Sequence, residues 1–353
     1  MVPVVDLSRR GALRSAEFAE LCQQILGGGT ILLGAQTTAF EAEFGAWTSG
    51  GEAVAVSSGA SAVQLALRAV GIGPGDEVIV PAFTAVPTAA AVCAVGAVPV
   101  FADVEPHSAN LDPARVEGAR TDRTKAVIVV HLYGRPAALP ITDLSIIEDA
   151  AQAHGALEDA TRSAATAYSF YPTKNLGGVG DGGAVVSTDP AVTEMIRRLR
   201  AHGMTEQYVH TDVSQNFRMS ELEAAWLRLN LPSLAADNER RRWIAARYRD
   251  AAPGLRWQAR ADAHVYHLCV LRSSRREAFR RALQHRGVST AVHYPLALTQ
   301  QPAYAHLTRA RCPQAEAWAA ECISVPCFPE LADSEVDLVA AALAATAGEV
   351  GTE

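Results

Sequence analysis

The sequence lacks the marks of secreted, membrane-spanning and nucleic-acid-binding proteins. Residues 1–15 contain no apolar core of signal-peptide length. No uncharged apolar run reaches the length of a membrane span. The net charge of -7 is spread without a long run of one sign, whereas nucleic-acid binding needs a basic face. We therefore expect a cytoplasmic protein that binds neither membranes nor nucleic acids.

Metal-binding motifs and nucleotide-binding loops are also missing. The six cysteines include no Cys-x-x-Cys pair, so we expect reduced thiols. His264 and His267 have no acidic or thiol partner at metal-binding spacing, so no metal site is expected. There is no G-x-x-x-x-G-K-[ST] loop. Gly178, Gly180 and Gly183 match G-x-G-x-x-G, but they precede a strand, whereas a dinucleotide-binding loop follows a strand and opens a helix.

What the sequence does contain is an alternation of short apolar strands and helices, which predicts an α/β fold with a parallel sheet. The chain of 353 residues is long enough for two domains, and we place their boundary at residue 235, giving domains 1–235 and 236–353. The basic run at residues 240–242 is expected on a solvated helix face. Strands are expected at residues 53–56, 78–80, 98–101, 125–130, 145–147, 184–187, 264–272 and 288–292.

One lysine, Lys174, stands inside a glycine-rich segment that covers residues 168–186. Aromatic residues precede it, and the glycines that follow allow the backbone to bend sharply. Partial desolvation in such a turn destabilises the ammonium ion and lowers its pKa, so that a neutral amine can attack a carbonyl group. The segment therefore suits a Schiff-base lysine, and an exposed loop lysine is the alternative that it leaves open.

A second segment has the form of a phosphate-binding turn. The strand at residues 53–56 runs into Ser57-Ser58-Gly59-Ala60-Ser61 and then into a helix. The first turn of a helix offers free backbone N–H groups and the positive end of the helix dipole, which attract phosphate. An ordinary serine helix cap is the alternative.

Asp149 is a carboxylate placed directly after a buried strand, where a charge needs a partner. A helix cap is the plain interpretation. The alternative is a carboxylate that keeps the pyridine nitrogen of a cofactor protonated. Lys174 and Asp149 together suit pyridoxal phosphate, because the lysine can bind its aldehyde and the aspartate can maintain the ring as an electron sink.

The two segments that contain Asp149 and Lys174 carry a resemblance to a known family: EDAAQAHGA at residues 148–156 and SFYPTKNLGGVGDGG at residues 169–183, in this order and spacing. With them the chain resembles the DegT/StrS-type sugar aminotransferases, which are pyridoxal-phosphate-dependent enzymes of fold type I. The resemblance runs from about Gly29 to the last helix. It implies a large domain with a mixed, mostly parallel seven-stranded sheet flanked by helices, and a smaller C-terminal α/β domain.

The resemblance also implies roles for individual residues. Lys174 would hold the cofactor covalently, Asp149 would partner its pyridine nitrogen, and Gln152 would lie beside its ring hydroxyl. Asn216 matches a residue that reaches the phosphate from the other subunit of a homodimer. The family's phosphate-binding positions are matched by Gly59, Ala60, Ser61 and Ser169, and its substrate-side loop by His293 and Tyr294.

The activity implied is transfer of an amino group from L-glutamate to a nucleotide-linked keto-6-deoxy sugar, with dTDP as the expected nucleotide and carbon 3 as the expected position. Amination at carbon 4 or of a keto-inositol is an alternative. A sugar dehydratase of the same family is another, but those enzymes carry histidine where Lys174 stands. A non-catalytic regulatory homologue is the third, and loss of the lysine or the aspartate would indicate it.

The sequence departs from the family at two cofactor positions. Threonine is usual where Ala60 stands, so backbone N–H groups would have to bind that end of the phosphate. An aromatic residue that stacks on the pyridine ring is frequent where Ala85 stands, and Phe83 is a candidate substitute.

Overall fold

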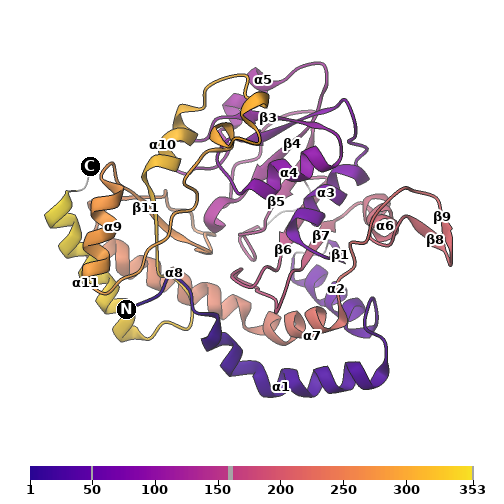
Figure 1. The fold of residues 1–353 in the computed structure, drawn as a ribbon, viewed down its shortest axis with the longest axis horizontal. Helices are drawn as coiled ribbons and strands as arrows, with labels where there is room; N and C mark the ends of the chain where they lie inside the picture. Colours follow the sequence, from indigo (N-terminus) through magenta and orange to yellow (C-terminus); the bar gives the residue numbers. More distant parts are fainter. Residues whose placement is uncertain (49–50, 158–161, 352–353) are drawn as a thin grey trace.

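The computed structural model describes residues 1–48, 51–157 and 162–351. At its centre lies a seven-stranded sheet with the strand order β1-β7-β6-β5-β4-β2-β3 (Figure 1). The strands are β1 (Glu52–Val56), β2 (Glu77–Pro81), β3 (Val98–Ala102), β4 (Thr124–Val130), β5 (Ser145–Asp149), β6 (Ala165–Ser169) and β7 (Gly183–Ser187). Strands β2 to β6 run parallel, and β7 is antiparallel to both of its neighbours, β1 and β6. The expected mixed, mostly parallel sheet is confirmed.

Helices cover both faces of this sheet because neighbouring strand residues point to opposite sides. In β1, Val54 and Val56 belong to the apolar core on one face, and Ala53 and Ala55 to the core on the other. A strand that is buried on both faces is a continuous apolar run, which explains why it was predicted from sequence. The first face is covered by α3 (Gly59–Ala69), α4 (Val86–Ala94) and α6 (Pro190–Leu199), and the second by α2 (Ala35–Trp47) and α7 (Glu221–Asn230).

The C-terminal part has a smaller antiparallel sheet and its own apolar core. Val2, at the start of the chain, joins this core and pairs with Val288. Trp318, in contrast, packs into the core of the large sheet, so the two parts interlock; the boundary at residue 235 stays a proposal. The elements are α8 (Leu234–Ala251), β10 (Arg256–Trp257), β11 (Cys269–Arg272), α9 (Arg276–His285), α10 (Pro313–Glu321), β12 (Cys322–Val325) and α11 (Asp333–Val350).

Two strands that the sequence predicted in this part differ in the structure: one is shorter than expected, and the other does not form. Only β11 forms within residues 264–272, because the backbone N–H groups of Val265 and Leu268 donate to the carbonyls of Gly134 and Tyr133. Residues 288–292 form two isolated bridges, with Val2 and with Ser324, rather than a strand.

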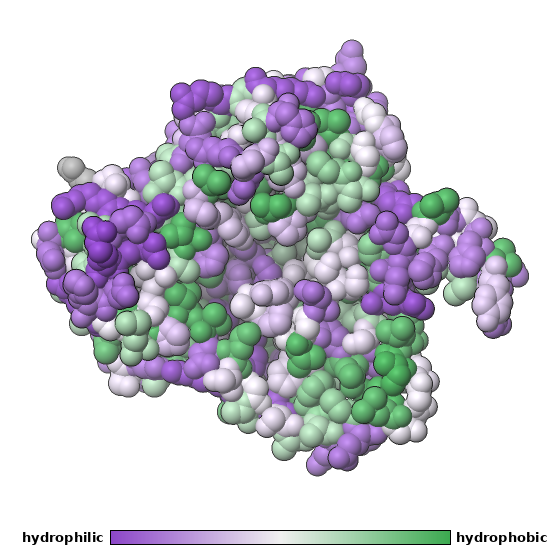
Figure 2. All heavy atoms as spheres, in the orientation of Figure 1, coloured by the Kyte–Doolittle hydropathy of each residue, from purple (hydrophilic) through white to green (hydrophobic). Residues whose placement is uncertain are grey.

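Helix α1 (Leu7–Gly28) and a small hairpin lie at the edge of the molecule (Figure 1). Helix α1 lies along α7, and the hairpin of β8 (Met204–Glu206) and β9 (Val209–His210) projects on one side. Apolar side chains are exposed at both places, and Figure 2 shows them gathered near the end of α1. Among the described helices, none combines the length and the apolar character that a membrane crossing requires. The exposed apolar residues include Leu26, Ile31 and Leu32 near the end of α1, and Met204, Tyr208, Val209 and Val213 in and beside the hairpin.

Glu77, at the start of β2, is a buried carboxylate that ties the C-terminal part to the large sheet. Its oxygens accept from the guanidinium groups of Arg309 at 2.7 Å and Arg123 at 2.6 Å, and from the Thr121 hydroxyl at 2.7 Å. The hydrogen bond from Arg309 is the main cause that lowers the pKa of Glu77 to about 2, from an ordinary value of 4.5. Because the folded pKa is depressed, the stabilisation is present above pH 4.5 and is lost as the pH falls toward 2.

We expect Glu77→Gln to lower the free energy of unfolding by about 1–3 kcal/mol at pH 7, since it removes the charge from buried charge-assisted hydrogen bonds. Urea unfolding of the wild type and the variant measures this difference, which should shrink when the pH is lowered below 4.5. Glu194→Gln, at a side chain that is 74% exposed, is the matched control. A difference that stays constant with pH would show that the ionised carboxylate is not the stabilising group.

Candidate active site

A cavity of about 240 Å³ opens where the carboxyl ends of the parallel strands meet the first turn of α3. The described residues that line it come from segments far apart in the chain, which the sheet brings to one edge. The lining includes the predicted residues Gly59, Ala60, Asp149, Gln152, Ser169 and Lys174, together with Ala85.

Lys174 extends into this cavity from a turn in which its own N–H donates to the Tyr171 carbonyl at 2.8 Å. Burial is the main cause that lowers the pKa of Lys174 to about 8, while the nearby Asp149 carboxylate acts in the opposite direction. This is the direction expected for a lysine that must present a neutral amine. Lys174 is therefore a half-buried lysine that lines a cavity and not an exposed loop lysine, and its lowered pKa suits the nucleophile expected from the sequence.

Helix α7 holds the glycine-rich turn that follows Lys174. The Glu223 carboxylate accepts from the N–H of Gly180 at 2.9 Å, and the Trp226 indole donates to the carbonyl of Gly177 at 2.9 Å. At Gly178, a Cβ atom would lie 1.5 Å from a carboxylate oxygen of Glu223, so only glycine fits there. The glycines thus allow the turn to approach α7 closely, and this approach fixes the position of Lys174.

Asp149 is the last residue of β5 and lies at the other side of the cavity. One of its oxygens accepts from the Thr88 hydroxyl at 2.9 Å, and the other from the N–H of Ala151 at 3.1 Å. Residues 150–157 form turns, so the interpretation of Asp149 as a helix cap is wrong. The carboxylate is 7% exposed and has no cation bonded to it among the described residues, which leaves it available to a protonated ring nitrogen.

The first turn of α3 closes the cavity at a third side. Helix α3 begins at Gly59, and the Ser58 hydroxyl accepts from the N–H of Ser61 at 3.1 Å. A Cβ atom on Gly59 would lie 2.5 Å from the Cβ of Ser169, so glycine lets the helix start approach β6. Ser61 itself does not line the cavity, because its hydroxyl bonds to those of Ser57 and Ser58. Ser61 therefore contributes to the helix end of the cavity only through its position in the first turn of α3.

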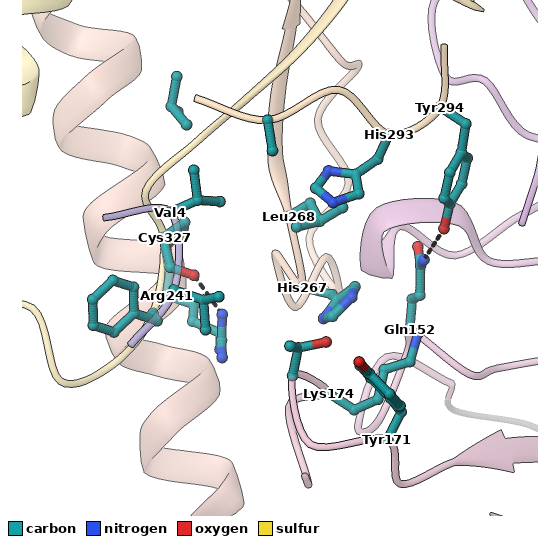
Figure 3. A pocket seen from close by; sticks show the side chains of 15 residues that line it. Val4, Gln152, Tyr171, Lys174, Arg241, His267, Leu268, His293, Tyr294 and Cys327 are labelled. Carbon is teal, nitrogen blue, oxygen red and sulfur yellow. Dashed lines mark hydrogen bonds between the residues drawn. The ribbon is translucent and has the colours of Figure 1, made fainter. Parts of the chain in front are cut away.

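Gln152, Tyr171 and Lys174 line both this cavity, called the cofactor cavity below, and a second one of about 390 Å³. The side-chain oxygen of Gln152 accepts from the N–H of Tyr133 at 2.6 Å, and its NH₂ group donates to the Tyr294 hydroxyl at 3.1 Å (Figure 3). His293, whose ring bonds to the Ser324 hydroxyl at 2.8 Å, also lines the second cavity. Both predicted substrate-side residues therefore face a space that is connected to Lys174.

Two residues considered for the cofactor, Asn216 of the expected partner subunit and Phe83, do not line the cofactor cavity of their own chain. Asn216 is exposed, its side-chain oxygen accepts hydrogen bonds from the neighbouring Arg218, and it is not among the described residues that line the cavity of its own chain. Phe83 packs against Trp318 and Tyr294 and does not line the cavity, so it is not the substitute for the aromatic residue that Ala85 lacks.

Sequence reasoning missed two residues of the site. Thr88, on the first turn of α4, was not distinguished from other threonines, although it is the hydroxyl that orients Asp149. Arg241 was assigned with its neighbours to a solvated helix face; it is 3% exposed and lines the second cavity, so that assignment is wrong for this residue. Its burial depends on contacts with residues 266 and 327, which no local pattern reveals.

The donor set of the cofactor cavity fits pyridoxal phosphate. It combines an amine whose pKa is lowered to about 8 by burial, a carboxylate for a pyridine nitrogen, and a helix N-terminus with the Ser169 hydroxyl for a phosphate. The wall at Ala85 lacks a stacking ring, and we find no aromatic side chain other than Tyr171 among the described residues that line this cavity.

Comparisons with known proteins agree with this fit. The family model described as "DegT/DnrJ/EryC1/StrS aminotransferase family" matches residues 13–344. The erythromycin biosynthesis sensory transduction protein EryC1 of Saccharopolyspora erythraea is 43% identical, covering 98% of this chain and 100% of its own. The dTDP-3-amino-3,4,6-trideoxy-alpha-D-glucose transaminase of Streptomyces venezuelae is also 43% identical, covering 94% and 92%.

The same fold is found in solved structures. The X-ray structure of DesV from S. venezuelae, in complex with a ketimine intermediate, is 40% identical and superimposes with a TM-score of 0.92. The match covers 98% of each chain, so the large and small parts are both shared.

Proposed function

Because the chain belongs to the DegT/DnrJ/EryC1/StrS aminotransferase family, whose members depend on pyridoxal phosphate, we propose that it transfers the amino group of L-glutamate to carbon 3 of a nucleotide-linked keto-6-deoxy sugar. The observation that carries the catalytic part is the single cavity that unites Lys174, Asp149 and the start of α3. The names of relatives such as the S. venezuelae transaminase support a dTDP-linked sugar and the carbon-3 position.

Each group of the cavity has a task in this reaction. Lys174 would hold the cofactor covalently, Asp149 would pair with its ring nitrogen, and the α3 start with Ser169 would bind its phosphate. Pyridoxal phosphate supplies an electron sink that stabilises negative charge on the donor's α-carbon. The amine of Lys174, once free, accepts and returns the proton at that carbon, a role suited to a pKa that burial lowers to about 8.

The regulatory alternative is supported by the names of two relatives, the EryC1 "sensory transduction protein" and a "pleiotropic regulatory protein" of Geobacillus stearothermophilus that is 37% identical. Against it stands the complete donor set, since a protein without turnover has no need of a desolvated lysine opposite an oriented carboxylate. The six free cysteines fit a reducing compartment such as the cytoplasm, where the sugar nucleotides would be met.

Incubation with pyridoxal phosphate, L-glutamate and a small panel of nucleotide-linked keto sugars tests the proposal. We expect 2-oxoglutarate and one aminated sugar, both detected by mass spectrometry. Protein that binds pyridoxal phosphate but forms no 2-oxoglutarate would favour a regulatory role, whereas one equivalent of 2-oxoglutarate per site with no aminated sugar would favour another acceptor class such as a keto-inositol.

We further propose that two chains form a dimer and share each site. Asn216 is exposed and lies outside the cavity of its own chain, beside the projecting hairpin of β8 and β9. The exposed apolar residues of the hairpin and of the end of α1 provide a surface that a second copy would cover (Figure 2). A two-fold dimer would then bring Asn216 of one chain to the phosphate end of the other.

The sharing is tested with two inactive variants, Lys174→Ala and Asn216→Asp, the second of which places a repelling carboxylate beside the phosphate. When the two are unfolded and refolded together in equal amounts, random pairing makes about half of the dimers mixed, and each mixed dimer has one intact site. Activity should therefore return to roughly a quarter of the wild-type value. An inactive mixture, with mixed dimers verified by mass, would place Asn216 in the site of its own chain.

A further inference from the structure

Arg241, on α8, is a buried cation without a carboxylate partner. It is 3% exposed, and one of its terminal nitrogens donates to the carbonyls of Cys327 and Tyr266. Its Nε is buried and has no hydrogen-bond partner, and within the described part of the chain it forms no ion pair. A buried charge that is only partly satisfied is costly, so such a residue is expected to meet an anion that the chain itself does not provide.

The groups around Arg241 leave the second cavity positively charged. Lys174 lines the same cavity, and burial lowers the pKa values of its two histidines, His267 and His293, which disfavours their charged forms. The nearest acidic groups, Asp237 and Glu330, act on Arg241 from outside the cavity and are not among its lining residues. No carboxylate of the described chain lines this cavity, so its charge is unbalanced.

The shape of the cavity suits a short flexible anion. Figure 3 shows Arg241 on the side opposite Gln152 and Tyr294, with Lys174 between them. The volume of about 390 Å³ is that of a small-molecule site. Its remaining walls are apolar and offer contact to methylene groups; they are formed by Val4, Val5, Leu268, Val325 and Phe328.

We propose that Arg241 binds a carboxylate of the amino donor and thereby positions the donor's amino group near Lys174. The inference rests on the proposed function, which supplies a dicarboxylate donor. The guanidinium presents a planar pair of N–H groups that matches the two oxygens of a carboxylate, which a neutral side chain or a single ammonium cannot do.

The test uses glutarate, a dicarboxylate without an amino group, whose binding to the cofactor-loaded protein is measured by calorimetry. We expect Arg241→Gln to weaken glutarate binding by about 10- to 100-fold, the loss typical of a hydrogen-bonded ion pair. Arg241→Lys should give an intermediate loss of glutarate affinity, because lysine keeps the positive charge but lacks the planar pair of N–H groups. Arg242→Gln, at the next residue of α8, where the side chain pairs with Glu239 and is 28% exposed, should bind glutarate like the wild type.

Arg241 also holds two backbone carbonyls, so its variants are first checked for thermal unfolding and for uptake of pyridoxal phosphate. Arg241→Lys can still donate to these carbonyls and serves if Arg241→Gln does not fold. Unchanged glutarate affinity in folded Arg241 variants would overturn the inference and leave Arg241 as a structural clamp. If the wild type does not react with L-glutamate, the proposed donor is wrong and the inference about Arg241 is wrong with it. This outcome is measured on the wild type alone and is therefore distinct from any effect of the Arg241 variants.

Discussion

Lys174→Ala should take up pyridoxal phosphate without forming a covalent bond to it and should lose turnover by at least about 10⁴-fold, because the nucleophile and the acid–base group are removed together. The structure supports so large an effect because no other amine lines the cofactor cavity among the described residues. The wild type treated with pyridoxal phosphate and borohydride should carry the reduced cofactor on one peptide, which contains Lys174.

The chain offers a matched control for this prediction. Its sequence contains only two lysines, and the other, Lys125, is exposed on β4. Lys125→Ala should label and turn over like the wild type. Label on Lys125 or on the N-terminal amine, with Lys174 unmodified, would remove Lys174 from the catalytic role.

Asp149→Asn should keep the cofactor bound through Lys174 but slow transamination by about 10²–10³-fold, since a neutral amide does not stabilise a protonated ring nitrogen. The visible absorbance of the loaded variant and the rate of its loss with L-glutamate measure the two effects separately. Near-normal turnover would reduce Asp149 to a residue that only shapes the turn after β5.

Thr88→Val and Asp143→Asn complete this experiment. Thr88 donates to Asp149, so its loss should give a smaller decrease in rate with the cofactor still bound. Asp143 is 75% exposed and remote from the cavity lining, so its amide variant should behave like the wild type. A rate loss in Asp143→Asn equal to that in Asp149→Asn would show that the effect is not specific to the ring-nitrogen position.

The parts of the fold that could be predicted are those whose signal is local. Strands β2 and β4 are runs of β-branched residues buried on both faces, and they read as strands without tertiary information. Strand β6, with the sequence ATAYS, has no such run and forms because β5 and β7 pair with it on either side. Strand β12 is not among the strands expected from the sequence, and its pairing with β11 is likewise a tertiary effect.

The residues of the candidate site also fall into those that the sequence could predict and those that it could not. Lys174 and Asp149 could be named because each stands at a strand or loop boundary with distinctive chemistry, and the family resemblance added their roles. Thr88 and Arg241 could not be named, because their importance depends on partners far away along the chain. Thr88 bonds to Asp149 at a separation of 61 residues, and Arg241 bonds to Cys327 at a separation of 86.

The proposed function is tested most directly by following the amino nitrogen. The protein, pyridoxal phosphate and ¹⁵N-labelled L-glutamate are incubated with a dTDP-linked 3-keto-6-deoxy sugar, and the product is examined by nuclear magnetic resonance. We predict ¹⁵N bound to carbon 3 of the sugar, with one 2-oxoglutarate formed for each sugar aminated. A sugar recovered without ¹⁵N, from protein that has bound pyridoxal phosphate at Lys174, would contradict the proposed reaction.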